Sequence, residues 1–280
     1  MNPKVSVIIP CYNEPENVFR RSLESVIRQT LEDIEIIIIL DNPDNNELKD
    51  IIGEYQSRCD KIVLLTPENN LGRGNARNLG IWSAQGKYVA IHDADDIDAP
   101  ERLGEQYDYM EENPEVGVVF SGTVFTDEQG SIIPDSKSTP TPESKSLFQK
   151  QLNHQTMFIK TEIIQAFGGY ADINYGEDID LWMRLYLEDI QMGKIDALHS
   201  YYLSPLESSH SDYIEKLKKW RLSSLQFYVK YFRHTARDPL FFRFLVTTLS
   251  DYVALHFGKK NYIKYRNFTS RVKNYNSENK

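Results

Sequence analysis

The stretch Tyr88-Val-Ala-Ile-His-Asp-Ala-Asp-Asp96 decides the fold, because an apolar run of strand length ends abruptly in three carboxylates. This pattern predicts a buried strand that delivers acidic side chains to one edge of a sheet. Carboxylates this close together repel one another and raise each other's pKa unless a cation neutralises them. A bound divalent metal would supply that cation and keep positions open for substrate phosphates. The alternative is a solvated acidic turn that caps the helix beginning near Pro100.

The chain before this stretch alternates apolar runs of strand length with segments of helical spacing. Strands are expected at 5–10, 34–40, 61–65 and 88–92, and helices at 16–29, 48–55 and 74–84. Continuous apolar strands separated by amphipathic helices indicate a Rossmann-like α/β fold with a mostly parallel sheet covered by helices. Ligands in such sheets bind beyond the carboxyl ends of the strands. The polar residues that follow the strands, Pro10 to Glu14, Asp41 and Asp93 to Asp96, are therefore expected to share one crevice.

The pattern changes after Pro100. A helix is expected at 102–112, a strand at 116–125 that continues as a hairpin to 131–133, an exposed loop at 135–143, a short strand at 154–160 and a helix at 177–187. The last helix opens with Glu177, Asp178 and Asp180, which the helix N-terminus stabilises. Capping alone is one explanation for these acids, and a catalytic role is the other.

Length and composition suit one large domain with an appendage. The chain has 280 residues, 40% of them hydrophobic, and we expect a domain at 1–211 and a C-terminal helical extension at 212–280. No apolar run reaches the roughly 18 residues that a bilayer span needs, and the N-terminus lacks a signal-peptide pattern, so we expect a cytoplasmic protein. Two cysteines, Cys11 and Cys59, favour reduced thiols over a disulfide framework.

The charge is distributed unevenly along the chain. Residues 1–212 carry 17 Lys and Arg against 37 Asp and Glu, and residues 213–280 carry 15 against 4, so the two parts have net charges of −20 and +11. An acidic body argues against nucleic-acid binding, whereas a basic, aromatic tail suits an anionic surface. A basic helical cap folded back on the acidic body is an equal alternative.

Five motifs, in this order, resemble those of family 2 glycosyltransferases of the GT-A type. They are Val5-Ser-Val-Ile-Ile-Pro-Cys-Tyr-Asn-Glu14, Asn70-Leu-Gly-Arg-Gly-Asn-Ala-Arg-Asn-Leu-Gly80, Asp93-Ala-Asp-Asp96, Gly168-Gly-Tyr170, and Glu177-Asp178 with Leu181-Trp182-Met-Arg184. The resemblance covers residues 4 to about 205. It implies transfer of a sugar, a hexose or an N-acetylhexosamine, from a nucleotide diphosphate donor with a divalent metal, Mn²⁺ or Mg²⁺, and inversion at the anomeric carbon.

The resemblance also implies roles for the acidic residues. A metal at Asp95, joined by Asp93 or Asp96, would stabilise negative charge on the departing diphosphate. For Asp93 the favoured role is contact with ribose or sugar hydroxyls. Asp178 would be the general base that accepts the proton of the acceptor hydroxyl. Glu177 would position the acceptor or the base, and Asp180 is the rival for the base role.

Nucleotide contacts are expected from the loops after the first two strands. Tyr12 can stack on the base, and Pro10 and Glu14 belong to the loop that resembles the family's base and ribose contacts. Asp41 can accept the N3–H of uracil, which cytosine lacks. Asn-Pro-Asp follows Asp41 where the family usually has Asp-Gly-Ser, and thymine carries the same N3–H, so a UDP-sugar is favoured and a dTDP-sugar stays open. Arg77 is expected to reach the diphosphate, with surface pairing as the alternative.

Acceptor and further metal contacts are assigned by the same resemblance. His154 lies where the family often has a polar residue near the acceptor, and Trp182 could form a floor for an acceptor sugar, although an aromatic residue on a helix is more often core. His210 falls where some relatives supply a metal ligand, and Ser209 and Ser211 could match that position instead. His92 and His199 are expected to be structural.

The tail, with helices expected at 213–232, 239–257 and 261–272, mixes aromatic and basic side chains. Such mixing suits an interfacial surface. We expect peripheral attachment at the cytoplasmic face of a bacterial inner membrane, where a lipid-linked or glycan acceptor would be presented; the alternative is a homodimer interface formed by the C-terminal helices.

Other classes fit less well. A haloacid dehalogenase-type phosphohydrolase places its Asp-x-Asp after the first strand, and a nucleotidyltransferase would need a Gly-rich loop near that strand. A noncatalytic nucleotide-sugar-binding scaffold remains the alternative to an enzyme of surface polysaccharide synthesis.

Overall fold

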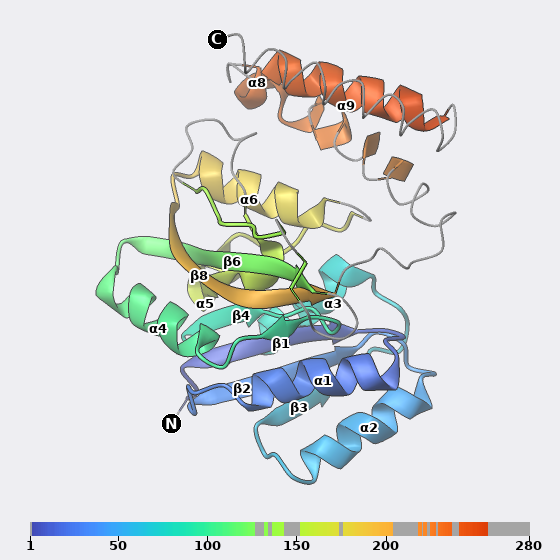
Figure 1. Ribbon diagram of the computed structural model, residues 1–280, viewed down its shortest axis with the longest axis vertical. Helices are drawn as coiled ribbons and strands as arrows, with labels where there is room; N and C mark the ends of the chain where they lie inside the picture. The colour runs from blue at the N-terminus through green and yellow to red at the C-terminus, as the bar shows by residue number, and fades with distance from the viewer. Residues whose placement is uncertain are drawn as a thin grey trace. The chain divides into compact units, whose positions relative to one another are not determined.

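The computed structural model describes residues 2–126, 132–133, 136–142, 152–173, 176–203, 218–219, 221–222, 225–227, 229–236 and 241–256 (Figure 1). The chain separates into two compact units, and the main division between them lies between Ser204 and Pro205. The boundary predicted at 211/212 falls outside the described residues, so it stays a prediction.

Parallel strands form one half of the sheet in the first unit. They are β1 (Val5–Cys11), β2 (Ile34–Leu40), β3 (Ile62–Leu65) and β4 (Tyr88–Ile91). β1 pairs in parallel with β2 on one side and with β4 on the other, and β2 pairs in parallel with β3. Apolar side chains on both faces of β1 and β2 are buried, as their unbroken apolar runs predict.

The other half of the sheet is mixed. It contains β5 (Ile97–Asp98), β6 (Val116–Thr126), β7 (Phe158–Lys160) and β8 (Gln191–Leu203), and the full strand order is β3-β2-β1-β4-β7-β6-β8-β5. β7 is antiparallel to both β4 and β6, β5 is antiparallel to β8, and β8 runs parallel to β6. The segment expected as a strand at 154–160 divides into a 3-10 turn, His154–Thr156, and β7. β5 and β8 were not predicted.

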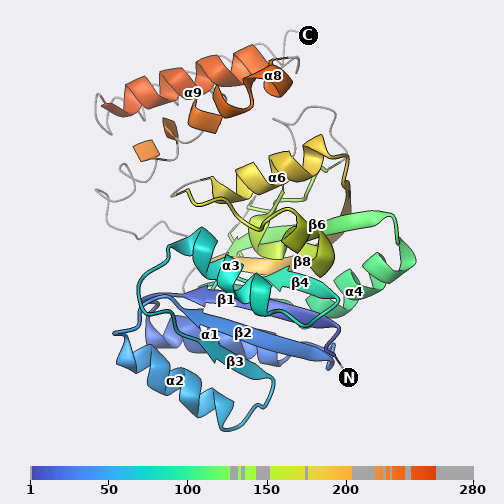
Figure 2. The same cartoon turned by 180° about the vertical axis from the view of Figure 1, so that it is seen from behind.

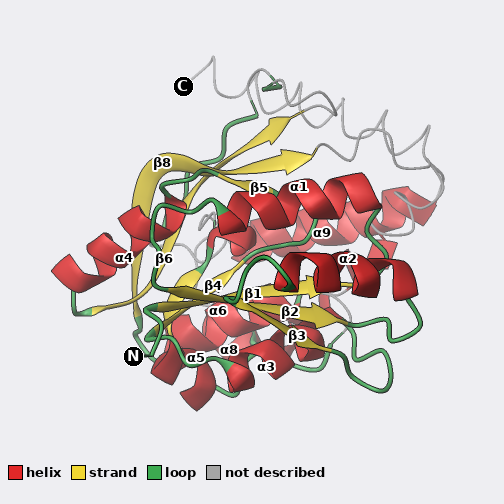
Figure 3. Ribbon diagram, turned by 90° about the horizontal axis from the view of Figure 1, so that it is seen from below, coloured by secondary structure: helices red, strands yellow, loops and turns green. Residues whose placement is uncertain are grey.

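Helices cover both faces of this sheet (Figures 2 and 3). Buried side chains of α1 (Glu16–Ile27), α2 (Asn46–Gln56) and α4 (Arg102–Glu112) form one apolar core with the sheet. Those of α3 (Arg73–Ser83), α5 (Thr161–Ala166) and α6 (Glu177–Leu187) form a second core on the other face. The predicted α/β architecture is therefore confirmed, with a mixed rather than purely parallel sheet.

The second unit contains α8 (Phe232–Thr235) and α9 (Phe241–His256), and α9 matches the helix expected at 239–257. An ion pair of 2.5 Å joins Arg221 to the buried Asp251 of α9. The helix expected at 261–272 lies outside the described residues. Within the described ranges, no helix is long and apolar enough to cross a membrane. Cys11 and Cys59 are both free thiols.

Candidate active site

The acidic loop predicted from the sequence follows β4 directly. Asp93 forms an ion pair of 2.7 Å with Arg77 of α3, and although burial alone would raise the pKa of Asp93, this guanidinium lowers it to about 2. Burial, followed by repulsion from Asp93, raises the pKa of Asp95. Asp96 is 1% exposed, and neither of its carboxylate oxygens has a hydrogen-bond partner among the described residues. The loop therefore holds more negative charge than its described surroundings neutralise.

A buried polar network holds the end of β4, where this loop begins. His92 contacts Asp98 through Nδ1 (2.8 Å) and Ser22 of α1 through Nε2 (2.7 Å). Arg102 of α4 pairs with Asp98 at 2.5 Å and donates to the backbone carbonyl of Ile91 at 2.7 Å. The network ties the end of β4 to two helices, which gives His92 the structural role expected for it.

The nucleotide-side residues lie at the same edge, beyond the ends of β1 and β2. Tyr12 is 46% exposed, and its backbone N–H donates to Glu14 at 2.7 Å. Burial raises the pKa of Glu14, and the negative charges of Asp95 and Asp93 raise it further, which places Glu14 within electrostatic reach of the acidic loop. Pro10 is the penultimate residue of β1. These loops and the acidic loop therefore follow the carboxyl ends of neighbouring strands, at one edge of the sheet.

Asp41 follows β2 and holds the loop before α3. Its Oδ1 accepts the backbone N–H of Leu71 (2.7 Å). Its Oδ2 accepts the backbone N–H of Gly72 (3.0 Å) and a hydrogen bond from the side-chain amide Nδ2 of Asn70 (3.2 Å). Gly72 has a φ of +80°, a conformation that favours glycine. A carboxylate has about four lone-pair sites, and these contacts occupy three of them.

One arginine joins the acidic loop to the start of α6. The guanidinium of Arg77 is buried between Asp93 and Glu177, at 2.7 Å and 3.2 Å, and stands 5.5 Å from the ring centroid of Tyr170. Beside this pair, burial and then the charge of Glu177 raise the pKa of Asp178 to about 6. A carboxylate with this pKa can accept a proton near neutral pH.

The two residues predicted for the acceptor meet next to these acids. His154 hydrogen-bonds the Tyr170 hydroxyl at 2.9 Å, and its ring centroid is 6.3 Å from that of Trp182. Burial, followed by the positive charge of Arg77, lowers the pKa of His154 to about 3, so its ring is neutral at physiological pH. Trp182 also packs edge-on against Phe120, with 6.1 Å between centroids.

Residues without a predicted role also belong to the site. Asn78 of α3 accepts the N–H of Tyr170 at 2.7 Å and donates to its carbonyl at 2.8 Å. Burial raises the pKa of Tyr202, at the end of β8, and so do the charges of the acidic loop, which places its ring near Asp93. The adjacent Gly168 and Gly169, both at positive φ, were a signal for the tight turn that presents Tyr170. No signal was available for Tyr202, because β8 was not predicted.

The acidic loop suits a divalent metal that protein carboxylates and the phosphates of a bound nucleotide hold together. Among the described residues, no group of three or more His, Cys, Asp or Glu side chains is arranged as a complete metal site. The unpartnered oxygens of Asp96 and the raised pKa of Asp95 mark uncompensated charge that a cation would neutralise. Magnesium-like ions are commonly held by one or two carboxylates together with substrate phosphates. His210, the other predicted ligand, lies outside the described residues.

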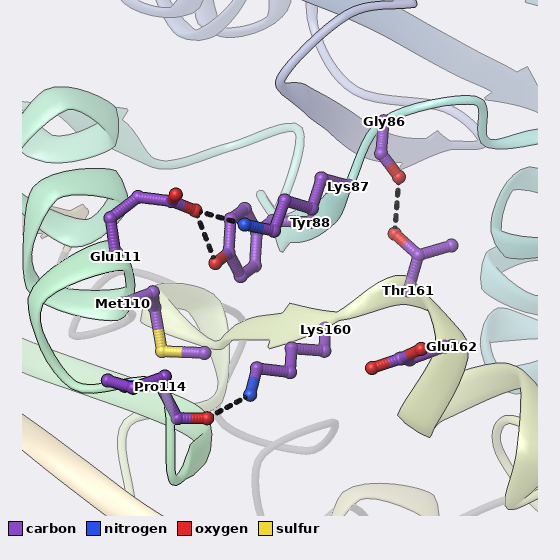
Figure 4. Close-up of a pocket in the computed structure, with 9 residues that line it drawn as sticks. All are labelled: Gly86, Lys87, Tyr88, Met110, Glu111, Pro114, Lys160, Thr161 and Glu162. Atoms are coloured by element: carbon purple, nitrogen blue, oxygen red, sulfur yellow. Dashed lines mark hydrogen bonds and ion pairs between the residues drawn. The ribbon is translucent and has the colours of Figure 1, made fainter.

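A hollow of about 490 Å³ lies at the opposite end of β4, where Tyr88 begins the strand (Figure 4). Its polar side chains largely satisfy one another: Glu111 accepts from Lys87 (2.5 Å) and from the Tyr88 hydroxyl (2.7 Å), and Lys160 donates to the Pro114 carbonyl (2.6 Å). None of the site residues predicted from the sequence lines this hollow, and Lys160 there contacts a carbonyl oxygen rather than a carboxylate. The loops at the carboxyl ends of the strands, where the predicted acids lie, are the better candidate site.

The mixed sheet, covered by helices and with acids after β4 and at the start of α6, defines a GT-A type glycosyltransferase fold. A family model described as "Glycosyl transferase family 2" matches residues 6–171. The chain therefore belongs to glycosyl transferase family 2.

Relatives and solved structures agree with this assignment. The chain is 35% identical over 262 residues to an uncharacterized glycosyltransferase of Methanocaldococcus jannaschii, covering 90% of this chain and 88% of the relative. It is 32% identical over 186 residues to the amylovoran biosynthesis glycosyltransferase AmsE of Erwinia amylovora, covering 64% and 68%.

Two solved structures share the fold. One is the mannosyltransferase PcManGT from Pyrobaculum calidifontis in complex with GDP-Man and Mn²⁺, with a TM-score of 0.64, 17% identity and coverage of 91% of this chain and 70% of that one. The other is S. aureus TarS 1-349 in complex with UDP-GlcNAc, with a TM-score of 0.60, 20% identity and coverage of 91% and 72%.

Proposed function

We propose that this chain is an inverting, metal-dependent glycosyltransferase that moves a hexose or N-acetylhexosamine from a nucleotide diphosphate, UDP being favoured, to a glycan or lipid-linked acceptor in surface polysaccharide synthesis. One observation carries the proposal. A buried arginine joins the uncompensated acidic loop to Glu177, and the next residue along α6, Asp178, is a carboxyl whose pKa is raised to about 6. Sugar transfer needs both: a place for metal and diphosphate, and a base for the acceptor.

Asp178 would perform the acid–base chemistry. Its carboxylate takes the proton of the acceptor hydroxyl as the oxygen forms a bond to the anomeric carbon. The bond between that carbon and the diphosphate oxygen breaks at the same time, and its electron pair leaves with the nucleoside diphosphate. Attack on the face opposite the leaving group inverts the configuration in a single displacement. Glu177, held by Arg77, lies beside the base.

The donor would bind at the carboxyl ends of the strands. Exposed Tyr12 offers its ring to the base, with Pro10 and Glu14 in the same loop, and Asp41 would accept a ring N–H. Asp93 would contact ribose or sugar hydroxyls, and the diphosphate contact of Arg77 stays a prediction. Support for this class of donor comes from the fold neighbours, which bind UDP-GlcNAc and GDP-Man.

Asp95, with His210 from outside the described residues, would hold the metal, Mn²⁺ or Mg²⁺. The ion would supply charge stabilisation for the departing diphosphate. The unpartnered oxygens of Asp96 and the Mn²⁺ of the PcManGT complex support this part of the proposal.

His154 and Trp182 would contact the acceptor sugar. The indole ring gives an apolar face and the neutral His154 a hydrogen-bonding nitrogen, and both lie beside Tyr170 and the start of α6. A sugar ring presents both an apolar face and hydroxyl groups, which this pair matches.

Calorimetric titration with UDP, dTDP and GDP in the presence of Mn²⁺ tests the donor assignment. We expect UDP to bind most tightly, and we expect Asp41→Asn to weaken UDP binding by about tenfold, in line with the loss of a charge-assisted hydrogen bond. Asp44→Asn, an exposed change in the same loop, is the matched control. Tighter binding of GDP would overturn the uracil assignment, and binding of UDP without transfer to any acceptor would favour the scaffold alternative.

The second unit would attach the enzyme, as a cytoplasmic protein, to the cytoplasmic face of the inner membrane. Val246, Leu249 and Val253 are exposed apolar side chains at helical spacing on α9, and the segment 213–280 carries a net charge of +11. An exposed apolar stripe on a helix of a basic segment suits anionic headgroups.

Flotation of the full chain with phosphatidylglycerol vesicles tests this attachment. We expect binding at low salt that falls at high salt and is weakened by Leu249→Asp, and no binding to phosphatidylcholine. If the chain ignores anionic vesicles and sediments as a dimer that Leu249→Asp dissociates, the homodimer alternative is correct.

A further inference from the structure

Two adjacent carboxyls open α6, and their surroundings differ. Glu177 is 6% exposed and accepts an ion pair from Arg77 at 3.2 Å. Asp178 accepts the backbone N–H of Ile179 at 2.8 Å, and no Lys or Arg among the described residues forms an ion pair with it. Either side chain could in principle act as a base, so something in the fold must distinguish them.

We infer that Arg77 is a positioning residue that assigns the roles of these two carboxyls: it neutralises Glu177 and leaves Asp178 as the one without a cation, able to take the acceptor proton. The inference rests on the proposed function for its catalytic meaning. Because the other end of the same guanidinium binds Asp93 at 2.7 Å, Arg77 also joins the acidic loop to the first residue of α6, next to the proposed base.

The packing of α3 holds Arg77 in this position. Gly74, one turn earlier on α3, lies so close to α6 that a Cβ on it would stand 3.7 Å from the Glu177 Cβ and 3.2 Å from the Ala171 carbonyl oxygen. Asn78, the next residue on α3, clamps the backbone of Tyr170, whose ring faces the guanidinium. The side chain of Arg77 is therefore enclosed by groups that α3 itself fixes.

The charges that face Asp178 have opposite effects on it. Glu177 on α6 raises its pKa, and Arg77 on α3 lowers it. Tyr170, before α6, is kept uncharged because burial raises its pKa far above neutrality. His154 is neutral because its pKa is low. Asp93 is negative, but its charge is paired with Arg77. Removing Arg77 and removing the charge of Glu177 should therefore move the titration of Asp178 in opposite directions.

Carbon-13 NMR titration of the Asp178 carboxyl, without donor, measures this effect directly in wild type, Arg77→Gln, Glu177→Gln and the double variant. The signal is identified by its absence in Asp178→Asn. A nearby charge shifts a buried carboxyl by about 1 pH unit or more. We expect Arg77→Gln to raise the titration midpoint by about 1 unit, Glu177→Gln to lower it by about 1 unit, and the double variant to lie near wild type. Arg77→Lys, which keeps the charge, should stay close to wild type.

Arg184→Gln is the matched control, because Arg184 forms an ion pair of 2.9 Å with Asp180 on the same helix. Arg184→Gln should leave the titration midpoint of Asp178 unchanged. Where the proposed function holds, the acid limb of kcat/KM should follow the same pattern, moving up for Arg77→Gln and down for Glu177→Gln. A role of Arg77 in packing alone would lower activity without this pair of opposite shifts.

Shifts in the same direction for the two single variants, or none in Glu177→Gln, would overturn the inference. Glu177→Gln is nearly isosteric and keeps Arg77, so it decides the question even if Arg77→Gln does not fold. The NMR titration requires no turnover. Opposite shifts without any sugar transfer would therefore contradict the proposed function and leave the role of Arg77 standing. Sugar transfer without opposite shifts would contradict the role of Arg77 and leave the proposed function standing.

Discussion

Asp178→Asn should make the protein more stable while it removes activity. The carboxyl of Asp178 has an ordinary pKa of 3.8 and a folded pKa of about 6, with burial as the largest cause. A carboxyl with a raised folded pKa contributes stability that is fully present below pH 3.8 and is lost as the pH rises through 6. Asparagine has no charge to bury, and its side-chain oxygen can still accept the Ile179 N–H.

The magnitude follows from the size of the rise in the pKa of Asp178. One pKa unit corresponds to 1.36 kcal/mol, so a rise of about two units lowers the free energy of unfolding of the wild-type protein by about 3 kcal/mol when the pH is above 7. We therefore expect the free energy of unfolding of Asp178→Asn to exceed that of wild type by up to about 3 kcal/mol at pH 8. This difference should shrink toward zero between pH 6 and pH 4. Sugar transfer should fall by about 10²- to 10⁴-fold, the usual contribution of a general base.

Urea denaturation followed by circular dichroism, at half-unit steps from pH 4 to pH 8, measures the difference. Asp180→Asn is the control on the same helix, because Asp180 is already paired with Arg184 at 2.9 Å and its loss should destabilise the fold. Parallel stability curves for wild type and Asp178→Asn would refute the reasoning, since they would show that the folded and unfolded carboxyls titrate alike.

Three further perturbations probe the surroundings of the site. Arg102→Met leaves Asp98 as a buried charge paired only with His92, and we expect a loss of about 3–5 kcal/mol in the free energy of unfolding; a loss below about 1 kcal/mol by urea denaturation would contradict the role given to the network. Cys11 is buried and burial raises its pKa, so Ellman's reagent should label Cys59 in the folded protein and Cys11 only after unfolding; equal rates at both thiols would argue against this burial. Gly169→Ala should cost more than about 1 kcal/mol, because a Cβ there would collide with Asn78, whereas Gly168→Ala meets no atom within 4 Å and should cost less; the reverse order of melting temperatures would be inconsistent with the clamp around Tyr170.

The first half of the sheet could be predicted from the sequence because its strands are buried on both faces. Strands such as β1 and β2 consist of unbroken apolar runs, and that signal is local. β8 escaped prediction because its residues 191–203 mix polar and apolar side chains, and its pairing with β6 joins segments far apart in the chain. β5 has only two residues, which is too short for any periodic pattern.

The candidate site likewise contains residues that local motifs predicted and contacts that no local pattern predicts. Local motifs identified the acids of the loop after β4 and the start of α6, since each stands beside a recognisable strand or helix. The contact between Arg77 and Glu177 joins residues 100 positions apart, and no spacing rule predicts it. The hydrogen bond between His154 and Tyr170 depends on the turn at Gly168 and Gly169, whose positive φ angles were implied by the glycines but whose direction was not.

Nucleotide release from a panel of UDP-, dTDP- and GDP-sugars, with Mn²⁺ or with chelator, tests the central claim most directly when wild type is compared with Asp95→Ala and Asp178→Asn. We expect wild type to consume one UDP-sugar, chelator and Asp95→Ala each to abolish that turnover, and Asp178→Asn to bind the donor without transferring the sugar. Consumption that persists with chelator and in both variants would contradict the assignment of metal and base, and failure to bind any nucleotide sugar would contradict the proposed glycosyltransferase activity itself.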